Sequence, residues 1–121
     1  MSKNMEISFL LDFYGDMLTE KQRSMVDYYY NEDLSLAEIA ENEGITRQGV
    51  RDSIKRAEAQ LLEMEERLAL AARFRRMQEE LQTVQENART LRAVNDRNGR
   101  IPEIEECAAK IAAAADRMAE A

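Results

Sequence analysis

The sequence has no histidine and no tryptophan, and it contains a single cysteine, a single proline and only four glycines. Because histidine is absent and Cys107 stands alone, the chain has neither the ligands of a Cys/His zinc site nor a Cys–His nucleophile pair, and it cannot form an internal disulfide. We therefore expect no enzymatic activity, no metal and no cofactor. Proline and glycine interrupt helices, so their scarcity favours an all-α fold.

Long apolar runs are also missing, so we expect no membrane span. The first residues, MSKNMEIS, lack the basic segment and apolar stretch of a secretory signal, and we expect a cytoplasmic protein. The net charge of −7 at pH 7 argues against a broad basic surface for nucleic acid.

A pattern of helix starts and stops is present between Leu18 and Leu62. Ser35 and Glu38 have the spacing of a capping box, Gly44 suits a left-handed helix end, and Thr46 can cap a second helix. These signals predict a helix-turn-helix. Apolar residues at helical spacing predict the packed faces of the two helices, namely Leu36, Ile39 and Ala40, then Val50, Ile54, Ala57 and Leu61. Ile45 is expected to fill the core at the turn.

The second helix of this pair has a cationic side. In DNA-binding helix-turn-helix proteins the start of this helix enters the major groove, where Arg can bond to guanine and Gln to adenine. Arg47, Gln48 and Arg51 are therefore the predicted base readers, and Lys55 and Arg56 are better placed for phosphates. Residues 47–56 carry a charge of +3, which leaves −10 for the rest of the chain. The alternative is a helix pair that serves stability, with these charges solvated.

Two helices are predicted before the motif. Residues 7–14 form a short apolar helix that ends near Gly15, and a capping box at Thr19 opens the next helix. That helix contains the triplet Tyr28–Tyr30, whose rings cannot share one face. We expect one or two of them to pack in the core.

The second half of the chain has the pattern of long helices. The apolar spacing shifts at residues 71–77, which predicts a break or bend at 71–75 and then a second long helix to about Val94. A turn follows at 95–100, and Pro102 suits the first turn of a final helix. We expect a helix-turn-helix domain over residues 1–70 and a helical hairpin or arm over 71–121. Narrow apolar stripes favour packing within the hairpin and leave open a homodimer through these C-terminal helices.

The motif resembles region 4 of bacterial sigma factors, and a larger set of residues resembles the YlxM family, also called UPF0122. This second resemblance covers roughly residues 7–80. It rests on Phe9–Tyr14, Leu18–Arg23, Tyr28–Tyr30, Ile39–Glu41, Thr46–Asp52, Ile54–Arg56 and Glu65–Glu66.

The YlxM resemblance implies a function that composition and spacing do not. Members of this family are encoded beside components of the signal recognition particle (SRP), so the resemblance implies a regulatory protein of the SRP targeting pathway. Its implied partners are SRP RNA and the SRP GTPase protein, and the helix-turn-helix adds DNA as a possible partner. The alternative is a protein-interaction module that modulates the SRP GTPase without binding nucleic acid. Residues 105–121 lie outside the resemblance.

Overall fold

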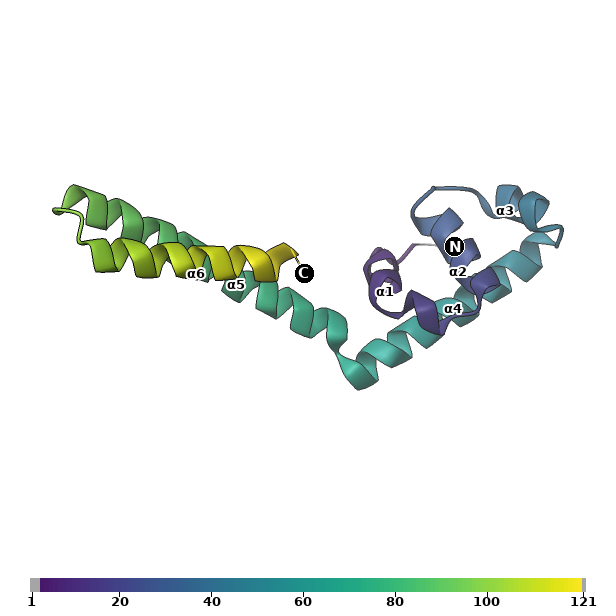
Figure 1. Cartoon of the computed structure of the whole chain (residues 1–121). Helices are drawn as coiled ribbons and strands as arrows, with labels where there is room; N and C mark the ends of the chain where they lie inside the picture. Colours follow the sequence, from purple (N-terminus) through teal and green to yellow (C-terminus); the bar gives the residue numbers. More distant parts are fainter. Residues whose placement is uncertain (1–2, 121) are drawn as a thin grey trace. The chain divides into compact units, whose positions relative to one another are not determined.

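The computed structural model describes residues 3–120. This part of the chain contains six α-helices, one 3-10 helix and no strand, which confirms the predicted all-α fold. Contacts divide the chain into two compact units, Met1–Ala72 and Arg73–Ala121. In order, the elements are α1 (Glu6–Tyr14), η1 (Gly15–Met17), α2 (Glu20–Tyr30), α3 (Leu36–Glu43), α4 (Arg47–Leu68), α5 (Leu70–Arg97) and α6 (Pro102–Glu120) (Figure 1).

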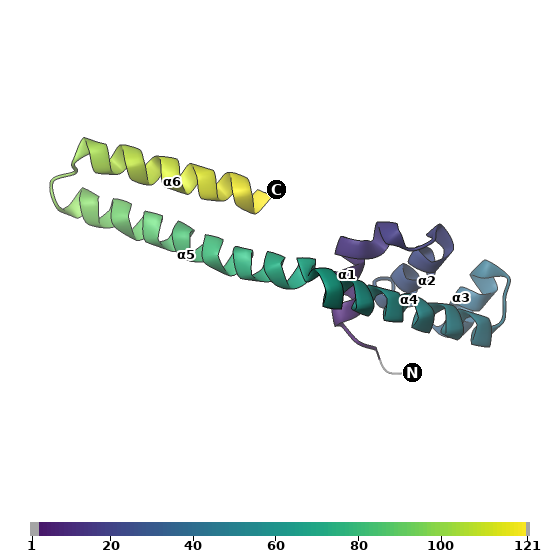
Figure 2. The ribbon, with the colours of Figure 1, turned by 90° about the horizontal axis from the view of Figure 1, so that it is seen from below.

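Helix α4 is the centre of the first unit, and α1, α2 and α3 all pack against it. Its inner face is fully buried and consists of the four predicted residues, Val50, Ile54, Ala57 and Leu61. Figures 1 and 2 show α1, α2 and α3 gathered along α4. The core that they enclose also contains Ile7, Leu10, Val26 and Ile39, each with no exposed surface.

The helix starts of this unit follow the predicted caps. The Thr19 hydroxyl accepts a hydrogen bond from the backbone N–H of Gln22 at 3.2 Å, and the Gln22 side chain accepts one from the N–H of Thr19 at 3.1 Å. The same reciprocal pair joins Ser35 and Glu38, with both distances 3.1 Å. Both capping boxes are confirmed, and α1 ends before Gly15 as predicted.

The tyrosine triplet packs as expected. Tyr29 and Tyr30 are buried, whereas Tyr28 is only partly buried. The rings of Tyr29 and Tyr30 meet edge to face with centroids 5.2 Å apart. The Tyr30 hydroxyl donates to the carboxylate of Glu58, and burial together with this hydrogen bond raises the pKa of Tyr30.

The break in the long helix lies at Ala69, before the predicted segment 71–75. Ala69 adopts the left-handed conformation with φ +54°, so α4 ends at Leu68 and α5 begins at Leu70. The buried Tyr14 hydroxyl donates to Glu65 Oε1 at 2.6 Å and accepts the N–H of Leu70 at 3.0 Å. The Glu65 carboxylate accepts the next two N–H groups, each at 3.0 Å. This carboxylate satisfies backbone donors that a helix start leaves free, which explains why the break precedes the shift in spacing.

In the second unit α5 and α6 form an antiparallel hairpin, which both ribbon views show (Figures 1 and 2). Asn95 is buried, and its side chain forms two hydrogen bonds of 2.9 Å with the backbone N–H and C=O of Ile101. These bonds fix the turn, and α5 continues to Arg97, three residues past the predicted end. Pro102 begins α6 as predicted. Within the described residues, no helix is both long and apolar enough to cross a membrane.

Candidate nucleic-acid interface

The α3–α4 pair is a helix-turn-helix with a three-residue turn. Helix α3 ends at Gly44, which is left-handed with φ +68°, a conformation that costs glycine no steric penalty. Thr46 then caps α4, because its hydroxyl accepts the N–H of Gly49 at 3.0 Å. Ile39 and Ala40 of α3 are buried in the same core as the inner face of α4. The predicted motif is therefore confirmed.

Ile45 does not fill the core at this turn, so that prediction was wrong. Its side chain is 39% exposed. It lies instead over Gly49 at the start of α4: a Cβ at position 49 would stand 3.6 Å from Ile45 Cδ1 and 3.2 Å from the Thr46 hydroxyl. The second distance is tighter than ordinary contact, which explains the glycine inside the first turns of α4.

The predicted site residues are all exposed on α4, but they do not share one side: Arg47, Gln48, Arg51, Lys55 and Arg56. At 3.6 residues per turn, Arg47, Arg51 and Lys55 follow one another along one side of the helix, with Gln48 beside them. We call Arg47, Arg51 and Lys55 the basic row. Arg56 lies about 140° around the axis from Arg51. The structure thus brings four of the five residues together and separates Arg56.

Within the described residues, no acidic side chain forms an ion pair with the basic row. In residues 3–120, Arg47, Arg51, Lys55 and Arg56 form no ion pair, whereas Arg67 on the same helix pairs with Glu63 at 3.2 Å. The first turn of α4 contains no acidic residue. Like charges four residues apart cost roughly 0.2–0.5 kcal/mol per pair, and cations at a helix start oppose its dipole. A bound anion would relieve both effects.

The predicted base-reading amide has a partner inside the helix. Gln48 Nε2 donates to Asp52 Oδ1 at 2.9 Å, so this exposed carboxylate orients the amide. Asp52 also places one negative charge close to the basic row. Its position four residues after Gln48 is the only sequence signal for this contact.

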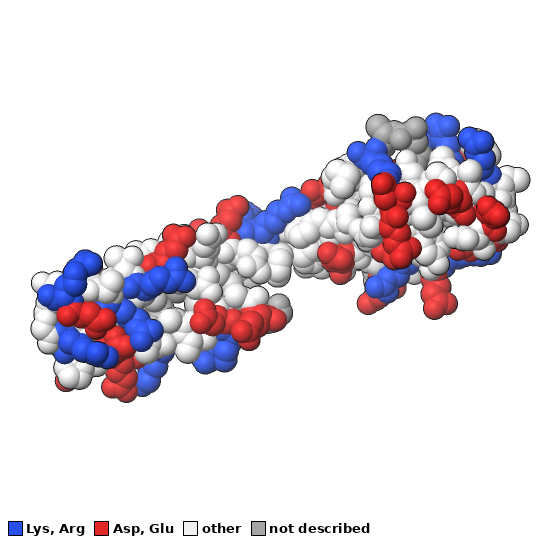
Figure 3. Space-filling view, turned by 90° about the horizontal axis from the view of Figure 1, so that it is seen from above, with Lys and Arg blue, Asp and Glu red and all other residues white. Residues whose placement is uncertain are grey.

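Leu36 was predicted only as a residue of the packed face of the first helix, but it also borders the candidate site. This side chain is half-buried and lines a shallow surface hollow together with Arg47, Gln48 and Arg51. An apolar group beside cations suits a ligand that has both charge and an apolar edge, such as a phosphodiester backbone with a thymine methyl group. Elsewhere basic and acidic side chains are interspersed over the face shown in Figure 3.

These features define the class: an all-α helix-turn-helix protein with an exposed cationic row on the second helix of the motif. The chain belongs to the UPF0122 family, whose model, described as "Putative helix-turn-helix protein, YlxM / p13 like", matches residues 1–100. The resemblance to the YlxM family is thereby confirmed. The family is described by its fold motif and not as an enzyme family.

Relatives in several bacteria share this similarity. The chain is 48% identical over 86 residues to UPF0122 protein BH2485 of Halalkalibacterium halodurans, which covers 71% of this chain and 79% of the relative. It is 51% identical over 69 residues to a UPF0122 protein of Desulforamulus reducens, covering 57% and 59%. A Bacillus cereus UPF0122 protein, BCAH187_A3894, is 49% identical over 78 residues, covering 64% and 71%. The family match ends at Arg100, so α6 lies beyond it.

Proposed function

We propose that this chain is a cytoplasmic regulatory protein of the SRP targeting pathway that binds DNA or SRP RNA through α4. The observation that carries the proposal is the basic row, which is exposed and forms no ion pair among the described residues. The pathway rests on what the resemblance to the YlxM family implies, and not on geometry. No catalytic step is part of this proposal.

The residues of α4 have different roles in it. Lys55 contacts phosphate, and Arg47 and Arg51 bond to phosphate or to base edges. Gln48 bonds to an adenine only after its amide breaks the hydrogen bond to Asp52. Asp52 therefore lowers the affinity for nucleic acid. Arg56 contacts a second stretch of backbone, because it lies on another side of the helix.

The test is a titration of labelled duplex DNA and of SRP RNA at several salt concentrations. Affinity falls as the salt concentration rises. Each phosphate contact makes the slope of log affinity against log salt concentration steeper by about 0.9 for duplex DNA and by about 0.7 for single strands. Arg51→Ala should weaken binding and lower this slope by about that amount. Arg67→Ala is the matched control, because it removes the same charge from the same helix at a position paired with Glu63. If both variants bind like the wild-type chain, the proposal fails.

The acidic remainder of the chain favours a second candidate, which is modulation of the SRP GTPase without nucleic acid. Outside residues 47–56 the charge is −10, which suits a basic protein surface better than a phosphate backbone. GTPase rates measured with the wild-type chain and with Arg51→Ala separate the two candidates. A nuclease-resistant effect that Arg51→Ala leaves intact supports the protein module. A homodimer through α5 and α6 is compatible with either candidate and forms part of the proposal.

A further inference from the structure

Both helices of the hairpin have an unbroken heptad pattern. Apolar or buried residues alternate at steps of three and four along α5, at Phe74, Met77, Leu81, Val84, Ala88, Leu91 and Asn95. The same steps occur from the turn through α6, at Ile101, Ile104, Ala108, Ile111, Ala115 and Met118. Such a pattern is typical of helices that pack in bundles or coiled coils.

Only one half of each pattern is buried inside the hairpin. Leu81, Ala88 and Asn95 of α5 are at most 7% exposed, and Ala108 and Ala115 of α6 at most 3%. The other half stays open to solvent. Val84 and Leu91 are each 42% exposed, Ile111 is 44% exposed and Met118 is 54% exposed, and Ile104 is half-buried.

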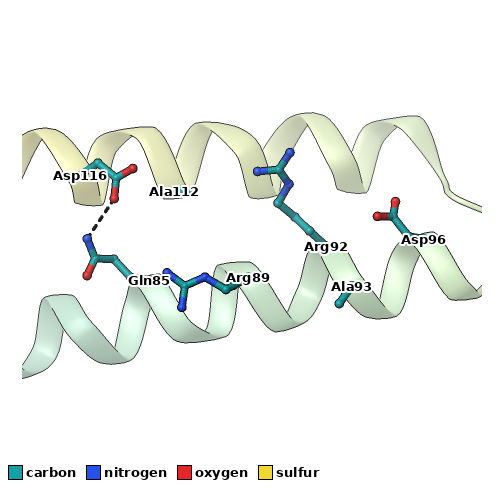
Figure 4. A pocket seen from close by; sticks show the side chains of 7 residues that line it. All are labelled: Gln85, Arg89, Arg92, Ala93, Asp96, Ala112 and Asp116. Atoms are coloured by element: carbon teal, nitrogen blue, oxygen red, sulfur yellow. Dashed lines mark hydrogen bonds between the residues drawn. The ribbon is translucent and has the colours of Figure 1, made fainter.

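The open halves of the two helices lie on the same side. In an antiparallel hairpin whose buried rows face each other, the positions three residues after each buried position point to one side. The opposite side is polar. There Gln85 donates to Asp116 at 2.9 Å, Arg92 donates to Glu105 at 2.7 Å, and an open cavity of about 430 Å³ lies between the helices (Figure 4). We call Val84, Leu91, Ile104, Ile111 and Met118 the apolar face.

We propose that the hairpin binds a second copy of itself through the apolar face, so that two hairpins complete a four-helix bundle. Two helices joined largely through alanines cannot cover the larger apolar side chains, and a bundle of four helices can. Three of the five residues of this face come from α6, beyond the residues that the family model matches. The inference rests on the proposed homodimer and names its surface.

The face suits its own copy in spacing and in charge. Rows with a seven-residue repeat need a partner with the same repeat, and the hairpin itself supplies one. About 100° around the helix axis from the apolar face, α6 exposes Glu103, Lys110 and Arg117 at seven-residue steps. When two such rows meet antiparallel, Glu103 of each copy lies opposite Arg117 of the other. The central Lys110 is already paired with Glu106 of its own chain at 3.1 Å.

Molar mass in solution tests the proposal. The wild-type chain should have the mass of a dimer at micromolar concentrations, in both light scattering and sedimentation. Ile111→Asp should halve that mass. Ala113→Asp is the matched control, because residue 113 is exposed two positions further along α6, away from the apolar face, and it should remain dimeric. Tyrosine fluorescence checks that the first unit stays folded, since all four tyrosines lie there.

Cross-linking locates the contact. Cys107 is the only cysteine, is exposed, and lies three residues after Ile104 and four before Ile111, so it is on the side of the apolar face. A short bis-maleimide should join two wild-type chains. It should not join chains in which the cysteine is moved by Cys107→Ala and Ala113→Cys. A monomer throughout overturns the homodimer. A dimer that Ile111→Asp leaves intact overturns the face alone, and nucleic-acid binding by α4 is untouched by either result.

Discussion

The two units of this chain bury their apolar residues to different extents. In the first, Ile54 and Leu61 of α4 have no exposed surface, and three other helices cover them. In the second, the buried contacts are made largely by alanines, and large side chains such as Leu91 and Ile111 stay about two-fifths exposed. The first unit thus completes its core within one chain, whereas the second leaves half of its heptad pattern open to solvent. We therefore expect the first unit to carry most of the stability, and the open half of the second unit is the surface of the proposed homodimer.

The largest effect is expected from a substitution in the core of the first unit. Ile54→Ala should lower the free energy of unfolding by about 2–5 kcal/mol, because it removes buried methylenes and leaves a cavity. Ile111→Ala is the matched change in the second unit. It should leave the unfolding of the first unit unchanged, because residue 111 contributes nothing to that core. Urea unfolding followed by tyrosine fluorescence measures the first unit alone. Equal effects of the two variants would contradict the comparison.

The sequence predicted most of the first unit because its signals are local. Capping boxes at Thr19 and Ser35, the glycine at position 44 and the apolar spacing along α4 each involve residues within a few positions of one another. A local signal did not predict tertiary packing correctly at the turn, where an apolar residue was expected to fill the core. Ile45 is apolar and lies in the turn, but its side chain lies over Gly49 and is 39% exposed.

The next effect concerns the start of α5. Glu65→Ala removes the acceptor for two backbone N–H groups and for the Tyr14 hydroxyl, and it should cost about 1–3 kcal/mol, since these hydrogen bonds involve a charged group. Glu66→Ala removes an exposed carboxylate next to it and should change stability by no more than about 0.5 kcal/mol. Urea midpoints by circular dichroism and by fluorescence give both values. If the two variants are equal, Glu65 does not fix the break.

This contact also explains why the break was predicted in the wrong place. Tyr14 and Glu65 are 51 residues apart, and no sequence signal near Ala69 predicts the contact between them. The candidate site shows the same limit. The residue types and helical position of Arg47, Arg51 and Lys55 could be read from the sequence. Their lack of ion pairs depends on where other carboxylates lie in the fold. The separation of Arg56 from the row, in contrast, follows from helix geometry and could have been predicted from the sequence.

Alkaline pH should weaken the first unit more than the second. Burial, and then a hydrogen bond to a glutamate, raises the pKa of both Tyr14 and Tyr30. The native state therefore keeps protons that the unfolded chain releases, so this stabilisation is complete below about pH 10 and is lost as the pH rises above it. The loss is at most about 1.4 kcal/mol per pH unit for each tyrosine.

Urea unfolding followed by circular dichroism across this pH range measures the effect. The Tyr14→Phe, Tyr30→Phe double variant is the control, because it keeps the rings and removes both ionisable hydroxyls. Its midpoint should fall less steeply with pH than that of the wild-type chain. Parallel curves would show that neither hydroxyl is held as the structure places it.

The smallest effect sharpens the comparison at the point where α4 ends. Ala69 has φ +54°, a left-handed conformation that costs a residue with a side chain about 1–2 kcal/mol more than glycine. Ala69→Gly should therefore stabilise the first unit, by about 0.5–1 kcal/mol after the greater chain entropy of glycine is subtracted. Ala59→Gly, in an exposed position inside α4, is the matched change and should destabilise it by a similar amount. A higher unfolding midpoint for Ala69→Gly and a lower one for Ala59→Gly would confirm a helix break at Ala69. Lower midpoints for both variants would mean that the helix continues through this residue.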